Sequence, residues 1–565
     1  MIEQVERLVA NHRGLVTAAL VILTTALLVA VMPRSPSIFD EGLILMDAQR
    51  VLAGEIPHRD FYTNYGPGQP YSVAAVLAVF GPGNLFAARV YGVITMALSV
   101  GLGYLLVARH LRPALGLFVA GIAALWVTAG GAYLYPIYPC MIFIFLSALL
   151  LMRPRAVEER WPVFLAGACA GVIALFRYDT GFFVLLAQVL FIFFDAPKNS
   201  SMIDRARRAV FPSFLAGIGS ALAFFPFAIA FLMVAPLSAF LRDIVEVSMN
   251  YAEMRGKPFP GIAELAQHSS KVGLYFPFLI VFVALADLIF RRRADDGANG
   301  SRQSQLVRLE TILAIFTGVL IYKGLNRVEF IHMMIAIVPG VFLAGTVAQR
   351  WLDAGRVQGL AAFGLMAVTI FPALGYGAFQ AREIVREFED RTLAWMVGID
   401  QPQVDCPQDN PTILHKDYEA VSRFLARYVP QDERILIGTD IHDRILVNTP
   451  VLYAQSVRKP ATLWAQYDPG VQTTAPVQQE MIGELEKYKV RWIVRTTPWP
   501  NVREPNGSSV SSGVTLLDDY LAQNFRPVAR AEAISIWLRK GETPPVIPAG
   551  MKCMPKAIEL PPATR

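Results

Sequence analysis

The chain has 565 residues, of which 54% are hydrophobic and only 17% are charged, and its mean hydropathy is +0.43. An ordinary soluble domain carries about 25% charged residues, so this composition excludes a wholly soluble protein. The net charge of +6 does not indicate a nucleic-acid partner, because the Lys and Arg residues lie in short loops between apolar runs.

The first two thirds of the chain contain eleven apolar runs that we predict to be membrane helices, because most approach the length that crosses about 30 Å of hydrocarbon. The first run lacks a small-residue cleavage site before Pro33, so we expect a retained helix rather than a signal peptide. The fifth, sixth and ninth runs are short and are expected to be tilted, broken or buried in protein. The predicted spans are 14–32, 85–108, 114–130, 137–152, 162–176, 181–194, 210–235, 272–290, 311–322, 333–348 and 358–378.

The loops between these runs differ in charge, which predicts their orientation. Cytoplasmic loops are enriched in Lys and Arg, and the N-terminus is therefore predicted to be cytoplasmic. An odd number of spans then places the C-terminal part outside the cytoplasm. The loops predicted to be cytoplasmic are 108–113, 153–160, 198–208, 291–308 and 349–356.

The first outer loop, 33–84, opens with the stretch "IFDEGLILMDAQRVLAG". Helical periodicity over 42–53 predicts a helix that is too short to span and lies along the membrane interface, and a second such helix is expected over 69–80. Asp40 is interpreted as a helix N-cap, with Glu41 favourable to the helix dipole. This interpretation is compatible with a carboxylate that faces a cavity.

The same loop contains an acidic and a basic residue at a spacing typical of a structural ion pair. Asp47 and Arg50 are three residues apart and are predicted to form an ion pair on the helix surface. Asp60 is either a functional carboxylate or a loop cap.

Other outer loops also carry charges and tyrosines. Arg177 and Asp179 either serve a ligand or pair only with each other. Three charged or polar residues in a later outer loop either have a functional role or form a cluster whose side chains extend to the membrane surface. These residues are Arg327, Glu329 and His332. Tyr133, Tyr135 and Tyr138 are more typical of an aromatic belt than of a sugar platform.

The last third of the chain reads as a small α/β domain over 381–545, followed by a proline-rich tail over 546–565. It lacks a glycine-rich phosphate loop, a metal-spaced Cys/His set and a Gly-x-Ser-x-Gly elbow, and we interpret His442 and Asp443 as loop residues. Cys406 and Cys553 flank the domain and either pair or stay free. Helices are predicted over 416–429, 476–489 and 515–525, strands over 434–439 and 490–497, and one or two strands over 526–540.

The first outer loop resembles that of the C-type (GT-C) membrane glycosyltransferases, of the kind represented by protein O-mannosyltransferases and lipid A aminoarabinose transferases. The resemblance rests on the acidic pair Asp40 and Glu41 just after the first span, followed by Ala48 to Gly54, Pro57 to Phe61 and Gly66-Pro67-Gly68. It implies a GT-C domain over 1–380 with about eleven transmembrane helices, and an outer C-terminal soluble α/β domain. The chain departs from many relatives in lacking a lysine near Tyr65-Gly66-Pro67.

The resemblance also implies an activity. The donor would be a polyprenyl-phosphate sugar, the acceptor a hydroxyl on a cell-envelope glycan, lipid or protein, and the setting the periplasmic face of a bacterial inner membrane. Asp40 is the expected catalytic base, with Glu41 beside it, and inversion at the sugar carbon is expected. The residues expected to hold the donor phosphate or substrate are Arg59, Asp60, Tyr65, Arg177, Asp179, Lys323, Arg327 and His332.

Whether a divalent metal, Mg or Mn, binds at Asp40 stays open, because some relatives use one and others do not. Two other functions also stay open. One is a transferase of a larger lipid-linked oligosaccharide, and the other is a transporter or flippase of a polyprenyl-linked sugar. Inverted repeats and charges at mid-membrane depth would favour a transporter, and neither is evident in the sequence. A receptor would leave the carboxylates of the first loop unexplained.

Overall fold

The computed structural model describes most of the chain as helices and strands. The described residues are 6, 9–33, 36–195, 200–246, 249, 251–267, 269–292, 301–387, 413–496, 503–531, 534–545 and 558–559. Cys406, Cys553 and most of the proline-rich tail lie outside the described residues.

The chain forms two compact units that are not simple successive segments. The first unit, called the helical unit here, comprises Met1–Pro33, Val90–Phe231 and Pro258–Glu389. The second, called the composite unit, comprises Arg34–Arg89, Leu232–Lys257 and Asp390–Arg565. The sequence analysis placed the loop 33–84 within a membrane domain over 1–380. In the structure, this loop packs with the C-terminal part of the chain.

The helical unit is built from long apolar helices. Among the described residues, seven helices are long and apolar enough to cross a membrane. Each of the eleven predicted spans coincides with a helix, although several helices have fewer than 18 residues, as expected for the fifth and sixth runs. The eleven helices are α2 (Arg13–Ala30), α5 (Leu85–Val107), α6 (Pro113–Ala129), α7 (Ile137–Leu151), α9 (Trp161–Phe176), α10 (Tyr178–Phe194), α11 (Met202–Leu232), α16 (Phe276–Arg292), α17 (Ser301–Gly324), α18 (Phe330–Ala354) and α19 (Arg356–Glu387).

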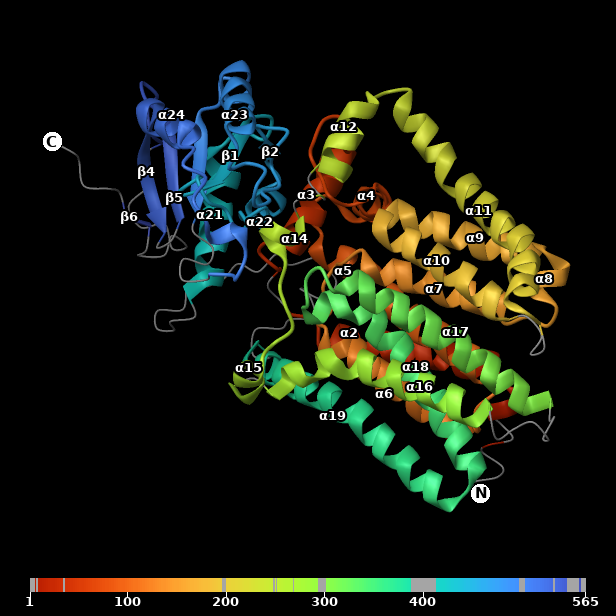
Figure 1. The fold of residues 1–565 in the computed structure, drawn as a ribbon. Coiled ribbons are helices and arrows are strands. Elements are labelled where there is room, and N and C mark those ends of the chain that lie inside the picture. The colour runs from red at the N-terminus through yellow and green to blue at the C-terminus, as the bar shows by residue number, and fades with distance from the viewer. Residues whose placement is uncertain are drawn as a thin grey trace. The chain divides into compact units, whose positions relative to one another are not determined.

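Helix α18 lies at the centre of one group of these helices. All its residues from Met333 to Arg350 are buried, because α6, α16, α17 and α19 pack around it (Figure 1). A helix that is apolar on every side is expected in such a position. A second group, α7, α9 and α10, joins the first where α10 packs on α17. Shorter helices complete the unit: α8 (Ala156–Glu159), α15 (Ile262–Gln267) and η2 (Ser269–Tyr275).

The composite unit contains a mixed six-stranded sheet with the strand order β2-β1-β3-β5-β4-β6. Strand β1 is parallel to β2 and β3, with Leu436 opposite Ile493, and the remaining pairs are antiparallel. The strands are β1 (Arg434–Thr439), β2 (Lys459–Pro460), β3 (Trp492–Thr496), β4 (Phe525–Ala531), β5 (Ile534–Arg539) and β6 (Ile558–Glu559). The predicted α/β class is therefore confirmed, with two strands after residue 525.

Helices cover both faces of this sheet. On one face, α23 (Ala475–Lys487) and α24 (Leu516–Asn524) contribute Met481, Leu485, Leu517 and Leu521 to the hydrophobic core. On the other face lie α21 (Ile413–Tyr428) and α22 (Val451–Ser456), which pack on each other (Figure 1). Alternate residues of a strand point to opposite faces, so both faces of β1 and β3 are buried.

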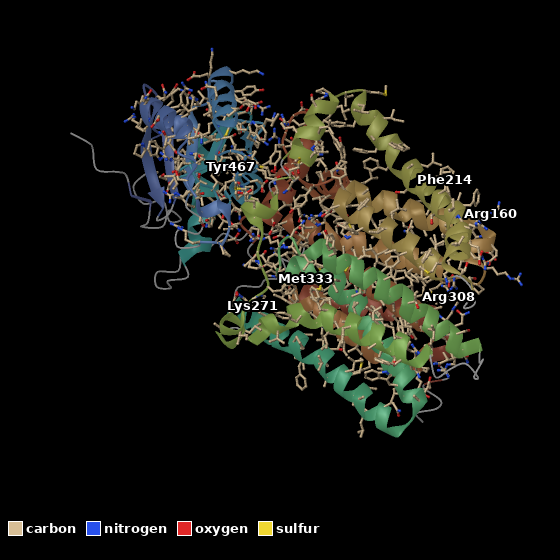
Figure 2. The ribbon with its side chains drawn as sticks, viewed as in Figure 1. Arg160, Phe214, Lys271, Arg308, Met333 and Tyr467 are labelled. Carbon is tan, nitrogen blue, oxygen red and sulfur yellow. The ribbon has the colours of Figure 1, made fainter. Side chains whose placement is uncertain are left out.

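The first outer loop is part of this unit. Tyr62 lies in the same hydrophobic core as the buried Tyr467, which sits among the strands and helices of the α/β fold (Figure 2). The loop contains α3 (Asp40–Leu52) and α4 (Gly68–Phe80), which pack on each other, and α3 also packs on α22. The remaining elements of the unit are α12 (Leu237–Leu241), η1 (Arg242–Glu246), α14 (Tyr251–Arg255) and η4 (Gly507–Ser509).

The apolar side of the first of these helices faces protein, whereas a helix lying on the membrane interface was expected to present it to lipid. Leu43, Ile44, Leu45 and Met46 are all buried within the protein, because α4 and α22 cover them. Periodicity identified the helix and its apolar residues, but it could not distinguish lipid from protein as the apolar partner.

Candidate functional site

The candidate catalytic carboxylate stands at the beginning of α3. Asp40 is the first residue of this helix and is half-buried. The N-cap is Phe39, so the prediction of Asp40 as N-cap is wrong by one position. The first N–H groups of a helix lack intrahelical partners and carry the positive end of its dipole. A carboxylate in this first turn is therefore stabilised in its charged form.

The neighbouring Glu41 has a different environment. Its side chain is fully buried, and the Arg89 guanidinium donates to both carboxylate oxygens over 2.8 and 2.7 Å. The backbone N–H of Ser37 also donates to Glu41 Oε2 over 3.1 Å. A bidentate guanidinium–carboxylate pair has a fixed geometry. This pairing ties the beginning of α3 to Arg89 in α5.

Asp47 and Arg50 do not form the predicted surface ion pair, because both are buried. Arg50 donates from Nε to Glu55, from Nη2 to the carbonyl of Asp60 over 2.8 Å, and from Nη1 to the carbonyl of Thr462 over 3.3 Å. Burial raises the pKa of Asp47 to about 8, although Arg50 and the Thr63 hydroxyl act to lower it. Asp47 therefore holds its proton at neutral pH.

Arg59 and Asp60 bind each other. The guanidinium of Arg59 donates to both oxygens of Asp60 over 2.9 and 2.6 Å, and the N–H of Ile56 donates to the same carboxylate over 2.8 Å. Burial acts to raise the pKa of Asp60, but the hydrogen bonds from Arg59 and Ile56 hold it below its ordinary value. Asp60 thus caps its own loop. Tyr65, the remaining candidate of this loop, is buried.

Two buried polar clusters in the composite unit were not predicted from the sequence. In the first, His58 Nδ1 lies 3.0 Å from Asp243 Oδ2, and Arg242 donates to the same carboxylate over 2.8 Å. His58 also has a positive φ of 67°, which is uncommon for a residue with a side chain. No local pattern links residues 185 positions apart.

The second cluster joins three distant segments. Asp468 accepts hydrogen bonds from the Tyr62 hydroxyl over 2.9 Å and from Gln466 over 2.6 Å, and Arg255 lies 2.8 Å from Asp468 Oδ1. Tyr62, Arg255, Gln466 and Asp468 are all buried. Buried charges require partners, so this cluster fixes the first loop and the 232–257 segment to the α/β fold.

In the helical unit, three candidates from two chain segments meet. Arg177 precedes α10 and donates to both oxygens of Asp179 over 3.2 Å. Lys323, near the end of α17, lies 3.9 Å from Asp179 Oδ2, and its side chain is only 3% exposed. Two cations thus share one carboxylate. The pairing of Arg177 with Asp179, one of the two alternatives left open by the sequence, is present, and Lys323 lies beside it.

The candidates Arg327 and His332 form a separate cluster. Arg327 donates to both oxygens of Glu329 over 2.9 Å. His332 Nδ1 lies 3.6 Å from Glu329 Oε2, and its Nε2 lies 3.0 Å from the Tyr135 hydroxyl. The charge of Arg327 is therefore balanced by a carboxylate. Tyr135 and Tyr138 are buried, so these two do not form a lipid-facing aromatic belt.

The described residues contain no group of three or more His, Cys, Asp or Glu side chains that could hold a metal ion. Asp40 therefore belongs to no such group among them. His442 is buried and binds Asp518 through both its backbone N–H and Nδ1, over 2.7 and 2.8 Å. The interpretation of His442 as a structural loop residue agrees with this geometry.

Comparisons with known proteins give a similarity among solved structures. No family model matches the chain, and no curated protein matches it. Among solved structures, the chain is similar to the crystal structure of ArnT from Cupriavidus metallidurans in the apo state. The match has 13% sequence identity and a TM-score of 0.46, and covers 93% of this chain and 97% of that chain.

Proposed function

We propose that this protein is a multi-pass membrane glycosyltransferase. In this proposal it moves a sugar from a polyprenyl-phosphate donor to a hydroxyl of a cell-envelope glycan, lipid or protein. The reaction would take place at the periplasmic face of the inner membrane, with the N-terminus in the cytoplasm. The supporting observation is the acidic first turn of α3, in which the half-buried Asp40 follows the first long apolar helix.

The proposed reaction is a direct displacement with inversion. Asp40 accepts the proton of the acceptor hydroxyl while the oxygen of that hydroxyl forms a bond to the anomeric carbon of the sugar. The bond from that carbon to the phosphate oxygen breaks, and its electron pair leaves with the polyprenyl phosphate. A general base must reach the proton that it removes.

We assign the donor phosphate to the cluster of Arg177, Asp179 and Lys323 in the helical unit. The cluster places two cations beside one carboxylate. A guanidinium can donate two hydrogen bonds to a phosphate. Arg327 is a weaker candidate because Glu329 already engages its guanidinium, and Arg59 is engaged by Asp60 in the same way.

Glu41 is better explained as a structural residue than as a second base, because Arg89 occupies both its oxygens. A divalent metal at Asp40 remains a hypothesis from the resemblance. The proposed mechanism assigns charge neutralisation of the leaving group to side-chain cations instead.

The test is a turnover and binding assay on the purified full-length protein with a panel of polyprenyl-phosphate sugars and an envelope extract as acceptor. Asp40→Asn should abolish release of polyprenyl phosphate while donor binding persists. Lys323→Met should weaken donor binding by about tenfold or more, since a charge-assisted hydrogen bond contributes about 1.5–3 kcal/mol. The control is Lys459→Met, which changes an exposed lysine of β2.

Full turnover by Asp40→Asn would remove this residue from the chemistry. Binding of a donor by the wild type without release of polyprenyl phosphate, with every acceptor fraction, would favour a carrier instead of a transferase. Unchanged donor affinity in Lys323→Met would exclude the assigned phosphate site.

A further inference from the structure

We infer that the α/β fold positions the proposed catalytic carboxylate, because helix α22 holds the first turns of α3 and thereby fixes Asp40. This inference rests on the proposed role of Asp40. It assigns positioning roles to Gly42 and Gln49, which do not take part in the chemistry. The C-terminal part of the chain then affects turnover by fixing the position of Asp40.

The first observation is a close approach of two backbones. Gly42 lies two residues after Asp40, and a Cβ added to it would lie 2.3 Å from the backbone nitrogen of Val451 and 2.6 Å from its Cα. Val451 is the first residue of α22, and its N–H donates to the carbonyl of Ile38 over 3.3 Å. Only glycine permits this approach, and no truncation of the Val451 side chain would relieve the clash.

The second observation is a set of hydrogen bonds that continue the same contact along α3. Gln49 Nε2 donates to the carbonyl of Ala454 in α22 over 2.9 Å, and to the carbonyl of Pro82 over 2.9 Å. The next residue, Arg50, donates to the carbonyl of Thr462. Beyond the helix, the N–H of Tyr62 donates to the carbonyl of Leu463 over 3.0 Å. The α/β fold thus contacts α3 at both ends.

Burial indicates that this contact is a permanent part of the unit. Residues Glu41 to Ala48 of α3 are all buried. Detaching α3 from α22 would expose apolar side chains, at a cost of about 25 cal/mol per Å². A helix held on one side by Arg89 and on the other by α22 has little freedom to move Asp40.

The size of the expected effect follows from the geometry. An added methyl group needs an ordinary contact distance of at least about 3.4 Å, so Gly42→Ala must push α3 and α22 apart by roughly 1 Å. A 1 Å misplacement of a catalytic group can lower a rate by about 100-fold. We therefore expect Gly42→Ala to lower kcat by about 100-fold, with donor affinity changed less than about twofold.

The matched control is Gly483→Ala in α23, where an added Cβ has nothing within 4 Å. This control should keep wild-type kcat. Hydrogen exchange of the amides of α3 gives a readout that does not depend on turnover, and exchange should be faster in Gly42→Ala and unchanged in Gly483→Ala. Wild-type kcat in Gly42→Ala would overturn the inference, as would wild-type exchange of α3.

A milder variant keeps the test decisive if Gly42→Ala does not fold. Gln49→Glu has the same shape but cannot donate to the carbonyls of Ala454 and Pro82, so kcat should fall by about tenfold and α3 should exchange faster. The control is Gln479→Glu on the exposed side of α23. An unchanged kcat in Gln49→Glu would count against positioning.

The proposed function fails separately. Activity of Asp40→Asn would refute the role of Asp40 whatever happens in Gly42→Ala. Loss of activity in Asp40→Asn together with full activity in Gly42→Ala would refute only the positioning inference.

Discussion

The buried pair of Glu41 and Arg89 allows a structural and a catalytic role for Glu41 to be separated. Both side chains are fully buried, and two hydrogen bonds of 2.8 and 2.7 Å join them. Removing one partner of such a pair leaves an uncompensated buried charge and costs about 3–5 kcal/mol. We expect Arg89→Met to have a cost of this size and to lower the Tm by several degrees.

The double variant Glu41→Leu, Arg89→Met provides the decisive comparison. Replacing a buried ion pair by apolar residues of similar volume is often close to neutral, so the double variant should regain most of the Tm lost in Arg89→Met. Tm is measured by thermal unfolding in detergent, and turnover is measured on the same samples. If Glu41 only holds α3 in place, the double variant should also regain a large part of its turnover.

Two results would contradict this reasoning. A double variant with wild-type Tm and no turnover would make Glu41 a catalytic group, despite its occupied oxygens. A double variant that is less stable than Arg89→Met would mean that the single-variant loss does not come from an unpaired charge.

Further expectations follow from single residues. The pKa of Asp47 is raised to about 8, so the folded state binds more protons than the unfolded state between about pH 4 and pH 8, and stability should fall as pH rises through this window. Asp47→Asn should therefore flatten the dependence of Tm on pH, whereas the exposed control Asp432→Asn should not, and an unchanged slope would contradict the raised pKa. Arg350 is buried beside Glu310 and 3.0 Å from Asp287; Arg350→Met should cost about 3–5 kcal/mol, and an unchanged Tm would argue against this pairing.

Helix packing gives another expectation. A Cβ at Gly171 in α9 would lie 2.2 Å from the carbonyl oxygen of Ser220 in α11, whereas a Cβ at Gly217 in α11 has nothing within 4 Å. Gly171→Leu should lower the Tm in detergent by several degrees and Gly217→Leu should not, because overpacking forces the two helices apart. Equal Tm values for the two variants would contradict the close packing of α9 on α11.

The sequence predicted the elements better than it predicted their partners. All eleven apolar runs are helices, and strand β1 has the predicted bounds 434–439, because periodicity and composition act locally. Helix α22 and strand β2 were missed, since each is too short to show a period. Burial of α3 was also missed, because an apolar helix face has the same pattern whether lipid or protein covers it.

The candidate site shows the same limit. Local spacing offered the pairing of Arg177 with Asp179, two residues apart, as one of two alternatives. Local spacing could not predict that Lys323 lies beside Asp179, or that Arg89 donates to both oxygens of Glu41. These contacts depend on the packing of helices that are distant in the sequence. The link between His58 and Asp243 has the same origin. Sequence patterns therefore identified charged residues that were candidates for the site. Which of these residues form ion pairs with one another depends on the tertiary structure.

The place of Tyr62 in the core of the α/β fold has a consequence for biosynthesis. Its hydroxyl binds Asp468, 406 residues later in the chain. At about 5–20 residues per second, the ribosome needs on the order of 20–80 s to add those residues. During this interval the first loop has been made but the strands that bury it have not, so Leu43, Ile44 and Met46 lack their final cover. Conditions that slow translation should lengthen this exposure and make the nascent chain more vulnerable to proteases and to aggregation.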